Sequence, residues 1–488
     1  MDSVVIRPVG PYNGGSQRGR WLFGYQEGSI MLSTPNLYES ESGDLLYAAT
    51  GESLISRALK PYREPRYLQL RDLLHSADVR TSHAEMLFHN YEDPPTYRPG
   101  GTYMRCDPRF LDDLKWMGIQ IMSTANNHSY DYGENGVLRN LGYMEQYNMP
   151  HAGTGGNMGE AAKPSYVDTP KGRFAMIAAT SSGPIAGRAG EARRDVMGRP
   201  GSNFIRWTQY WTVERQQFDA LKQVADKLGW TQQAAQRRAV LGGATHSDTE
   251  VLLMDHGQYE EDASSRFVLG ESFTKKSVIN KNDLDRNVRS VRDAARMADW
   301  VVFTIHNHEG GATPNEPSDH IKELAHAVID AGAHAFVGHG PHQDRGMEIY
   351  KGRPIFYALG DFVLENDSVE LVPQDNIERQ NLGWESTPAD FYDVRAGYDA
   401  SNKPTRGQSV QPIRWQSTMP LISFKNRELS KIELHPVDLG FGKPRSMQGR
   451  PLLADGAVAR EILERFQDFS RPFGTRINIQ GNSASVVL

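Results

Sequence analysis

Five short segments of this chain concentrate side chains that bind metals or transfer protons. They lie at 50–52 (TGE), 82–85 (SHAE), 125–131 (ANNHSYD), 304–309 (TIHNHE) and 338–342 (GHGPH). Each segment follows a predicted strand, and four of the five strands are apolar. Because the carboxyl ends of strands in an open α/β sheet meet at one edge, we expect the five segments to build one shared site.

The elements that must position these segments alternate between strands and helices. Apolar runs predict strands at 45–50, 118–123, 174–180, 300–305, 335–337 and 354–357, and a more polar strand is predicted at 78–85. Helical spacing of apolar residues predicts helices at 66–76, 110–117, 136–147, 283–297 and 320–331. This alternation predicts an α/β fold in which helices cover a sheet.

Regions outside this alternation suggest how the chain is divided. Residues 1–44 are rich in Gly, Ser, Asn and Pro, which predicts an irregular N-terminal extension. Residues 181–282, with a helix at 213–228 and few clear strands, and residues 366–416 look like two irregular insertions. We therefore expect a catalytic domain at 45–440, which ends in a hairpin at 419–424 and 429–435. Residues 441–488 are expected to form a tail that packs on the core.

Composition excludes several classes of protein. The net charge of −6 gives no basis for binding nucleic acid or an anionic membrane, since both favour basic surfaces. The single cysteine, Cys106, excludes an internal disulfide framework and is compatible with a reducing compartment. The first residues do not resemble a signal peptide, and no apolar run is long enough to span a membrane. We expect a cytoplasmic protein with a small-molecule or peptide substrate, and self-association into a homo-oligomer is compatible with this composition.

Several motifs, in order along the chain, resemble those of a known family. The stretch STANNHSYDYGENG at 123–136 resembles the ANNH…D.G..G signature of the bacterial capsule-synthesis (CapA, poly-γ-glutamate) family. The segment GHGPH at 338–342 is similar to the family's GHHPH, and EIYKGRPIFYALGDF at 348–362 is similar to its E.Y.G.PI.YSLGNF block. The resemblance covers roughly 45–180 and 283–440. It implies a metallophosphatase-like layered α/β sandwich with two irregular insertions.

The chain departs from the family pattern at four places that carry site residues. The family's Gly-Asp, Asn-Leu-Glu, His-Trp-Gly and Gly-Asn-Phe appear here as Gly51-Glu52, His83-Ala84-Glu85, His306-Asn307-His308 and Gly360-Asp361-Phe362. Glutamate and histidine still bind metals, but the longer Glu52 side chain moves its oxygens by about one C–C bond. That change would disturb a two-metal centre whose ions lie roughly 3.5–4 Å apart.

The first chemistry that these residues suggest is metal-assisted hydrolysis of a phosphoester or a γ-glutamyl-type amide. The expected ligands of one or two divalent ions are Glu52, Glu85, Asn127, His306, His339 and His342. A mixed set of nitrogen and oxygen donors suits Mn, Fe or Zn better than Mg. In this hypothesis His128 is a general acid whose ring is oriented by Asp131.

The second chemistry needs no metal. Histidines and carboxylates on two sides of a substrate can supply a base and an acid for a lyase or an epimerase. The candidates for proton transfer are His128, Asp131, His308 and Glu85, and those for substrate binding are Arg80, Arg105, Tyr130 and Asn126. Aromatic residues of the insertions, such as Trp207 and Trp415, either line a lid over an aromatic substrate or pack the insertions onto the core. A third hypothesis is a binding protein that keeps the fold without catalysis.

Overall fold

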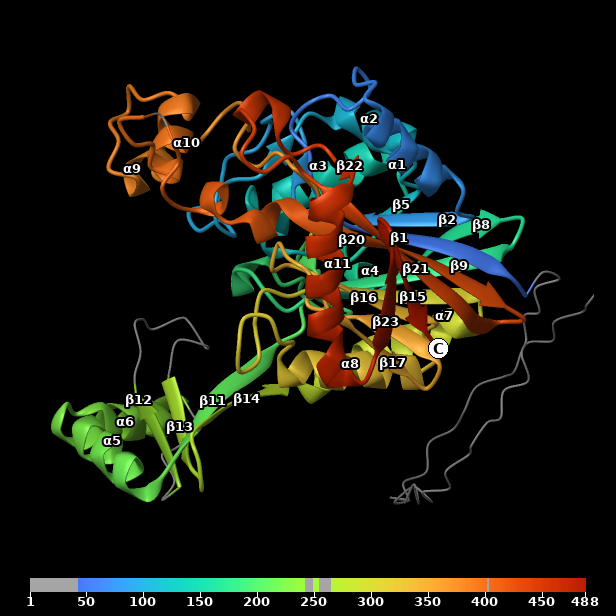
Figure 1. Ribbon diagram of the computed structural model, residues 1–488. Coiled ribbons are helices and arrows are strands. Elements are labelled where there is room, and N and C mark those ends of the chain that lie inside the picture. The colour runs from blue at the N-terminus through green and yellow to red at the C-terminus, as the bar shows by residue number, and fades with distance from the viewer. Residues whose placement is uncertain (1–42, 242–248, 254–264, 402) are drawn as a thin grey trace, which may run out of the picture. The chain divides into compact units, whose positions relative to one another are not determined.

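The computed structural model describes residues 43–241, 249–253, 265–401 and 403–488 (Figure 1). Of the predicted N-terminal extension, residues 1–42 lie outside this description. Among the described residues, the largest sheet has the order β23-β24-β21-β20-β1-β2-β5-β6, with β19 beside β1 and β22 beside β21. Its strands are β1 (Leu45–Leu54), β2 (Val79–His83), β5 (Ile121–Ser123), β6 (His151–Ala152), β19 (Asp361–Leu364), β20 (Gln416–Lys425), β21 (Glu428–Asp438), β22 (Leu452–Leu453), β23 (Arg476–Gln480) and β24 (Ser483–Val487).

A second sheet has the order β17-β18-β16-β15-β9-β8. Its strands are β8 (Ser165–Thr169), β9 (Gly172–Thr180), β15 (Trp300–His306), β16 (Ala335–His339), β17 (Met347–Tyr350) and β18 (Arg353–Phe356). Strands β9, β15, β16 and β18 are parallel. The continuous apolar sequences of β15 and β16 follow from this position, since a central parallel strand is buried on both faces.

The two sheets pack face to face through one apolar layer. Tyr47 and Val79 from the first sheet share this layer with Phe174 and Trp300 from the second, and the rings of Tyr47 and Phe174 are 5.5 Å apart. The outer face of the first sheet is covered by α1 (Pro65–His75), α2 (Leu111–Met117) and α3 (Gly133–Gln146). The outer face of the second is covered by α7 (Lys281–Ala295) and α8 (Asp319–Asp330) (Figure 1). This is the metallophosphatase-like layered α/β sandwich that the resemblance predicted.

Helix α8 shows how the sequence secures these layers. Its buried residues Ile321, Leu324, Ala325 and Val328 follow the i, i+3, i+4, i+7 spacing of an apolar helix face. Burying each of the larger side chains contributes roughly 1.5–3 kcal/mol. The helix therefore holds the second sheet in place behind the strand ends that carry the histidines.

The first insertion contains a sheet that the sequence pattern did not indicate. Strands β11 (Trp207–Val213), β12 (Glu250–Leu253), β13 (Ser265–Leu269) and β14 (Thr274–Ile279) pair in the order β12-β13-β11-β14. Helices α5 (Arg215–Lys227) and α6 (Trp230–Leu241) lie with them (Figure 1). The expectation of few strands here was wrong, because these short segments pair with partners distant in sequence and carry little periodicity of their own.

Other short elements complete the described chain. They are β3 (Leu87–Phe88), β4 (Arg105–Cys106), β7 (Thr154–Gly155), β10 (Gly201–Ser202), α4 (Met158–Ala161), α9 (Gln374–Arg379) and α10 (Pro388–Ala396). The predicted hairpin at the end of the main domain is confirmed as the antiparallel pair of β20 and β21. Helix α11 (Gly456–Ser470) places Leu463 and Phe466 in the layer between the sheets.

The domain limits proposed from the sequence stay a prediction. Within the described residues, no helix has both the length and the apolar character needed to cross a bilayer.

Candidate active site

The register of the parallel strands brings the polar strand ends together at one edge. In the first sheet, Glu52 on β1 is paired with His83 on β2 and with Asp361 on β19. In the second sheet, His306 on β15 is paired with His339 on β16. All five residues are buried. Residues separated by up to about three hundred positions in sequence therefore meet because their strands end at the same level.

The glycine before Glu52 is required by the close approach of two chain segments. A Cβ atom on Gly51 would lie 1.5 Å from the carbonyl oxygen of Gly360. The register of β1 shifts at this point, and the amide of Glu52 donates to the same carbonyl at 3.3 Å. The irregularity turns the Glu52 side chain toward the second sheet, as local breaks in strand pairing near active sites commonly do.

Three buried carboxylates surround the ring of His342. Nδ1 of His342 lies 3.0 Å from Asp361 Oδ1, 3.2 Å from Glu52 Oε2 and 3.6 Å from Glu85 Oε2. His342 itself has a backbone φ of 52°, a left-handed conformation that is uncommon outside glycine. The GHGPH segment thus holds this ring in a turn that faces the carboxylates.

Four further histidines extend the cluster toward the second sheet. His306 lies between Glu52 and His308: its Nδ1 is 3.0 Å from Glu52 Oε1, and its Nε2 is 3.0 Å from Nε2 of His308. Both Nε2 atoms are 3.8 Å from Glu85 Oε1. The His83 ring stacks on His306 at 4.9 Å and on His339 at 4.8 Å. The result is a continuous layer of nitrogen and oxygen donors.

Many of these buried atoms have no hydrogen-bond partner in the described part of the chain. They are both carboxylate oxygens of Glu52, both of Glu85, Asp361 Oδ2, Asn127 Oδ1, His83 Nε2, His306 Nδ1 and His339 Nδ1. Of these, the Glu52 oxygens still form ion pairs with His306 and His342. Leaving buried polar atoms unpaired is costly, and leaving buried charges unpaired costs more. Three overlapping groups place their donor atoms within 4.8 Å of one another: Glu52, His83 and His306; Glu85, His306 and His308; and Glu52, Glu85, His342 and Asp361. These residues fit a divalent cation, which would satisfy the unpaired atoms.

Without a cation, protons are distributed unequally within the cluster. Burial and the nearby Glu52 carboxylate raise the pKa of Glu85 well above its usual value. Burial opposes the charge on His342, but the carboxylates of Glu85, Asp361 and Glu52 raise its pKa well above the usual value. Burial also opposes the charge on Glu52, but His342 and His306 hold the pKa of Glu52 well below its usual value. The surroundings therefore favour the ionised form of Glu52 and the protonated form of Glu85, an asymmetry found in acid–base sites.

A histidine and aspartate pair borders the cluster. Nδ1 of His128 lies 2.7 Å from Asp131 Oδ2, and Nε2 of His128 lies 4.0 Å from Glu85 Oε1. Asp131 also accepts hydrogen bonds from the amides of Gly100 and Met104, which fix the carboxylate. With its Nδ1 directed to Asp131, His128 presents Nε2 to the site, as oriented catalytic imidazoles do.

A buried arginine holds the loop that carries His306 and His308. Arg345 donates to the carbonyl oxygens of His308 (2.9 Å), Glu309 (2.9 Å) and Pro314 (3.0 Å) and to Oδ1 of Asn307 (3.0 Å). Burial lowers the pKa of Arg345 to about 10, so the guanidinium remains charged at neutral pH. Hydrogen bonds from a charged donor are stronger than neutral ones, which makes this loop rigid.

Comparison with known proteins places the chain in a family. Residues 41–366 match the model of the bacterial capsule synthesis protein family, PGA_cap. The chain belongs to this family. It is similar to the protein y4uA of Sinorhizobium fredii, with 32% identity over 445 residues that cover 88% of this chain and 90% of the relative. The PGA biosynthesis protein CapA of Bacillus subtilis is 22% identical over 316 residues, which cover 62% of this chain and 61% of the relative.

The structure brings together most of the family-derived ligand and proton-transfer candidates. Glu52, Glu85, His306, His308 and His342 lie in the donor cluster, with His128 and Asp131 beside it. Asn127 and His128 line a cavity together with His308 and His342. His339 is adjacent, but it is stacked on His83 and lies outside the three donor groups.

The predicted substrate-binding residues are placed differently. Arg80, near the other end of β2, donates to the carbonyls of Ala77 and Gly118. Arg105 donates to the carbonyl of His89 and stacks on the ring of Tyr91 at 4.1 Å. Asn126 caps the 3-10 turn of Asn127–Tyr130 by accepting from the His128 amide. Tyr130 lies in that same turn and packs near Gly187. Each of the four has a local structural role.

Two donors were not among the predicted site residues. His83 and Asp361 both belong to the donor groups, and both occupy positions where the chain departs from the family pattern. A signal was therefore present, since each replaces an asparagine with a stronger ligand directly at a strand end. The strand pairing of Glu52 with both residues explains why they meet.

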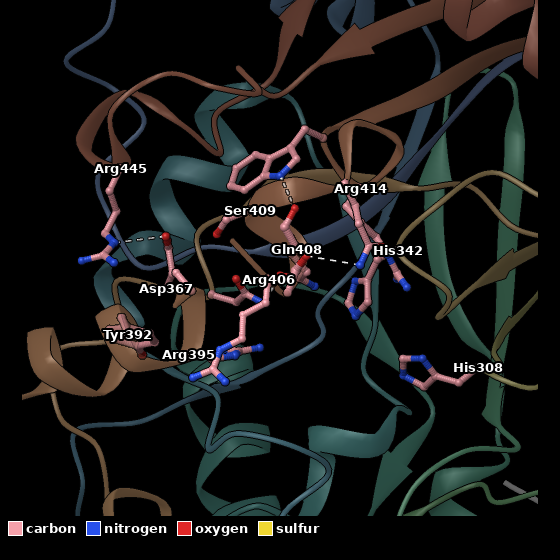
Figure 2. A pocket seen from close by; sticks show the side chains of 15 residues that line it. His308, His342, Asp367, Tyr392, Arg395, Arg406, Gln408, Ser409, Arg414 and Arg445 are labelled. Carbon is pink, nitrogen blue, oxygen red and sulfur yellow. Dashed lines mark hydrogen bonds and ion pairs between the residues drawn. The ribbon is translucent and has the colours of Figure 1, made fainter. Parts of the chain in front are cut away.

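Two adjoining cavities open beside His308 and His342. The larger has a volume of about 360 Å³ and the smaller about 260 Å³, and both are bordered by Asn366, Arg395 and Gln408. Figure 2 shows the larger cavity with Arg414 beside His342, and with Arg395 and Arg406 farther from the two histidines. Of the insertion aromatics, Tyr392 and Trp415 line this cavity. Others pack elsewhere, such as Trp207, which stacks on His320 at 4.6 Å.

Proposed function

We propose that this chain is a metal-dependent hydrolase of a phosphoester or a γ-glutamyl-type amide. The observation that carries the proposal is the set of buried carboxylate and imidazole atoms without partners at the joined ends of two sheets. A purely structural core would not gather three buried carboxylates around one histidine, because each isolated charge opposes folding.

The residues that would hold one or two divalent ions are Glu52, Glu85, Asp361, His83, His306, His308 and His342. Mixed imidazole and carboxylate donors suit Mn, Fe or Zn. When bound, such an ion supplies a water of lowered pKa and polarises an oxygen of the substrate.

The remaining residues would position and protonate the substrate. His128, held by Asp131, directs Nε2 toward the cluster and would protonate the leaving group. Arg345 fixes the loop of His306 and His308, so that the donors do not rearrange during turnover. Asn127 offers an unpaired Oδ1 beside His128.

The relatives support the choice of substrate class. The B. subtilis relative is named for PGA biosynthesis, and the family model carries the same term. A γ-glutamyl-type amide is therefore one of the two bonds that we propose. We also propose that the protein works in the cytoplasm on a small-molecule or peptide substrate, without a nucleic-acid or membrane partner. The negative net charge and the single cysteine support this setting.

One observation favours a second candidate, a metal-free lyase or epimerase. His342 already contacts Asp361 and Glu52 at 3.0 and 3.2 Å, and His128 already contacts Asp131, so proton-transfer pairs exist within the chain itself. A non-catalytic binding protein is the third reading, and loss of all turnover would support it.

Metal content and chelation test the proposal. The purified protein is analysed by elemental mass spectrometry, and activity is assayed before and after chelation on a nitrophenyl phosphoester and a γ-glutamyl anilide. We expect bound transition metal and turnover that chelation abolishes and that Mn, Fe or Zn restores. Glu52→Gln should lose bound metal and turnover together. Glu464→Gln, which changes an exposed side chain of α11, should keep both. Hydrolysis that persists at full rate in metal-free protein would refute the metal-dependent mechanism.

A further inference from the structure

The larger cavity beside the donor cluster has a wall that the family model does not cover. His308 and His342 border it, and the rest of its lining comes from residues 366–415 and Arg445. The family match ends at residue 366. This wall is therefore a feature of the second insertion, placed directly against two residues of the candidate active site (Figure 2).

The wall carries an excess of positive charge. Arg395, Arg406 and Arg414 line the cavity, and Asp367 is the one acidic residue among the described residues that do so. Asp367 is already paired with Arg445 at 3.3 Å, and Arg445 also contacts Asp393 at 2.9 Å. In the described part of the chain, Arg395, Arg406 and Arg414 form no ion pair with a carboxylate, although the nearby charge of Asp367 partly balances that of Arg395. Such a focus of one charge sign attracts an oppositely charged ligand.

Arg395 has the greatest unused capacity for binding. Its Nη1 atom is buried and has no hydrogen-bond partner among the described residues. Burial lowers the pKa of Arg395, which means that the surroundings oppose its charge. It borders both cavities, the one near His128 and the one of the insertion. Arg395 itself is half-buried, and a buried N–H of a charged group is costly to leave unpaired unless an anion accepts from it.

The other two arginines are partly engaged with backbone carbonyls. Arg406 donates to the carbonyl of Val394, and Arg414 donates to the carbonyl of Pro341, the residue before His342. Both of these hydrogen bonds go to neutral backbone carbonyls. Arg414 therefore links the position of His342 to the cavity wall, and the planar guanidinium groups retain donors for a ligand.

We propose that this cavity binds an anionic group of the substrate, a carboxylate or a phosphate that is distinct from the bond that reacts. Arg395 is the main residue that determines specificity for this group. The inference rests on the proposed function, since it takes the reacting bond to lie at the donor cluster. His308 and His342 belong to both the cluster and the cavity wall, so one small substrate can reach both.

Binding of simple anions tests the pocket without any turnover. Inorganic phosphate and glutarate, as phosphate and carboxylate probes, are titrated into the chelated full-length protein by calorimetry. We expect saturable binding of at least one probe that weakens at high salt, and the preferred probe identifies the type of anion. Arg395→Gln should weaken that binding by about tenfold or more, as expected for losing a bidentate charged contact. Arg460→Gln, an exposed arginine of α11, should leave it within twofold.

The proposal is overturned if neither probe binds the wild type, or if Arg395→Gln and Arg460→Gln bind equally. Arg406→Gln provides a second variant if Arg395→Gln does not fold, and it should also weaken binding. A turnover arm compares a γ-glutamyl anilide with its α-carboxamide counterpart. Arg395→Gln should reduce kcat/KM only for the charged substrate. Since the calorimetry does not depend on catalysis, a failed hydrolase assay with intact anion binding would reject the proposed function and retain the pocket.

Discussion

Adding a divalent metal to the stripped protein should raise its thermal stability. The buried oxygens of Glu52, Glu85 and Asp361 have few partners in the described structure, and a cation would satisfy several of them at once. The folded chain assembles these donors from strands far apart in sequence, so the unfolded chain binds the ion much more weakly. Binding to the folded state alone shifts the unfolding equilibrium.

The size of this effect follows from the affinity and from the size of the domain. At a free metal concentration about one hundred times Kd, the stabilisation is about 2.7 kcal/mol. An unfolding entropy of about 2.1 cal/mol/K per residue, taken over roughly 430 described residues, gives about 0.9 kcal/mol per kelvin. Tm should therefore rise by about 3 °C, and by more if the metal binds more tightly.

Scanning calorimetry of chelated protein with and without Mn or Zn measures this shift. Glu52 belongs to two of the three donor groups, so Glu52→Gln should remove most of the shift. Glu464→Gln, which changes an exposed glutamate of α11, should show the full shift. A shift equal in the two variants would mean that the metal binds elsewhere, and no shift in the wild type would refute the cation site.

Three further perturbations test the surroundings of the site. Arg345→Gln should lower the free energy of unfolding by roughly 3–5 kcal/mol because it leaves several buried carbonyls unpaired, and an unchanged urea midpoint would contradict this. Burial lowers the pKa of His320 to about 3, so stability should be lost as pH falls below the unfolded pKa of about 6.5, by about 2 kcal/mol at pH 5. Between neutral pH and about pH 5, the Tm of His320→Phe should therefore fall by about 2 °C less than the Tm of the wild type. A substitution at His75, which is exposed, should leave the pH dependence of Tm as it is in the wild type. Gly51→Ala should prevent stable folding, because its Cβ would overlap a backbone carbonyl. Gly142→Ala lies at an exposed helical position with no neighbour within 4 Å and should raise the free energy of unfolding by up to about 1 kcal/mol. Soluble yield and Tm distinguish the two variants.

Much of the fold could be predicted because its signals are local. The apolar runs at 300–305 and 335–337 correspond to β15 and β16, and the helical spacing at 320–331 corresponds to α8. Each of these patterns arises because one face, or both faces, of an element are buried, so apolar residues recur at fixed intervals along the sequence. The sheet of β11 to β14 lacks such a pattern and was missed, since its strands are short and their pairing is not local.

The candidate site shows the same division. The residue types at strand ends predicted a shared cluster that contains Glu52, Glu85, His306 and His342, and these donors do meet. Arginines are harder to assign from sequence, because the sequence does not show whether a guanidinium will bind a ligand or a backbone carbonyl. Arg80 engages carbonyls near its own strand, whereas Arg395, in a stretch without clear pattern, borders the cavity.

The sequence by itself determined the family, the alternation of strands and helices, and the chemistry available at the strand ends. These depend on residue types and on spacing along the chain. The tertiary structure alone decided which donors share a centre, because strand register pairs Glu52 with His83 and Asp361 but places His339 in a stack beside them. It also decided that arginines of the second insertion share a cavity with His308 and His342, and that Arg395 keeps a buried Nη1 without a hydrogen-bond partner among the described residues. Such contacts join segments far apart in sequence, and only the packed sheets fix their distances.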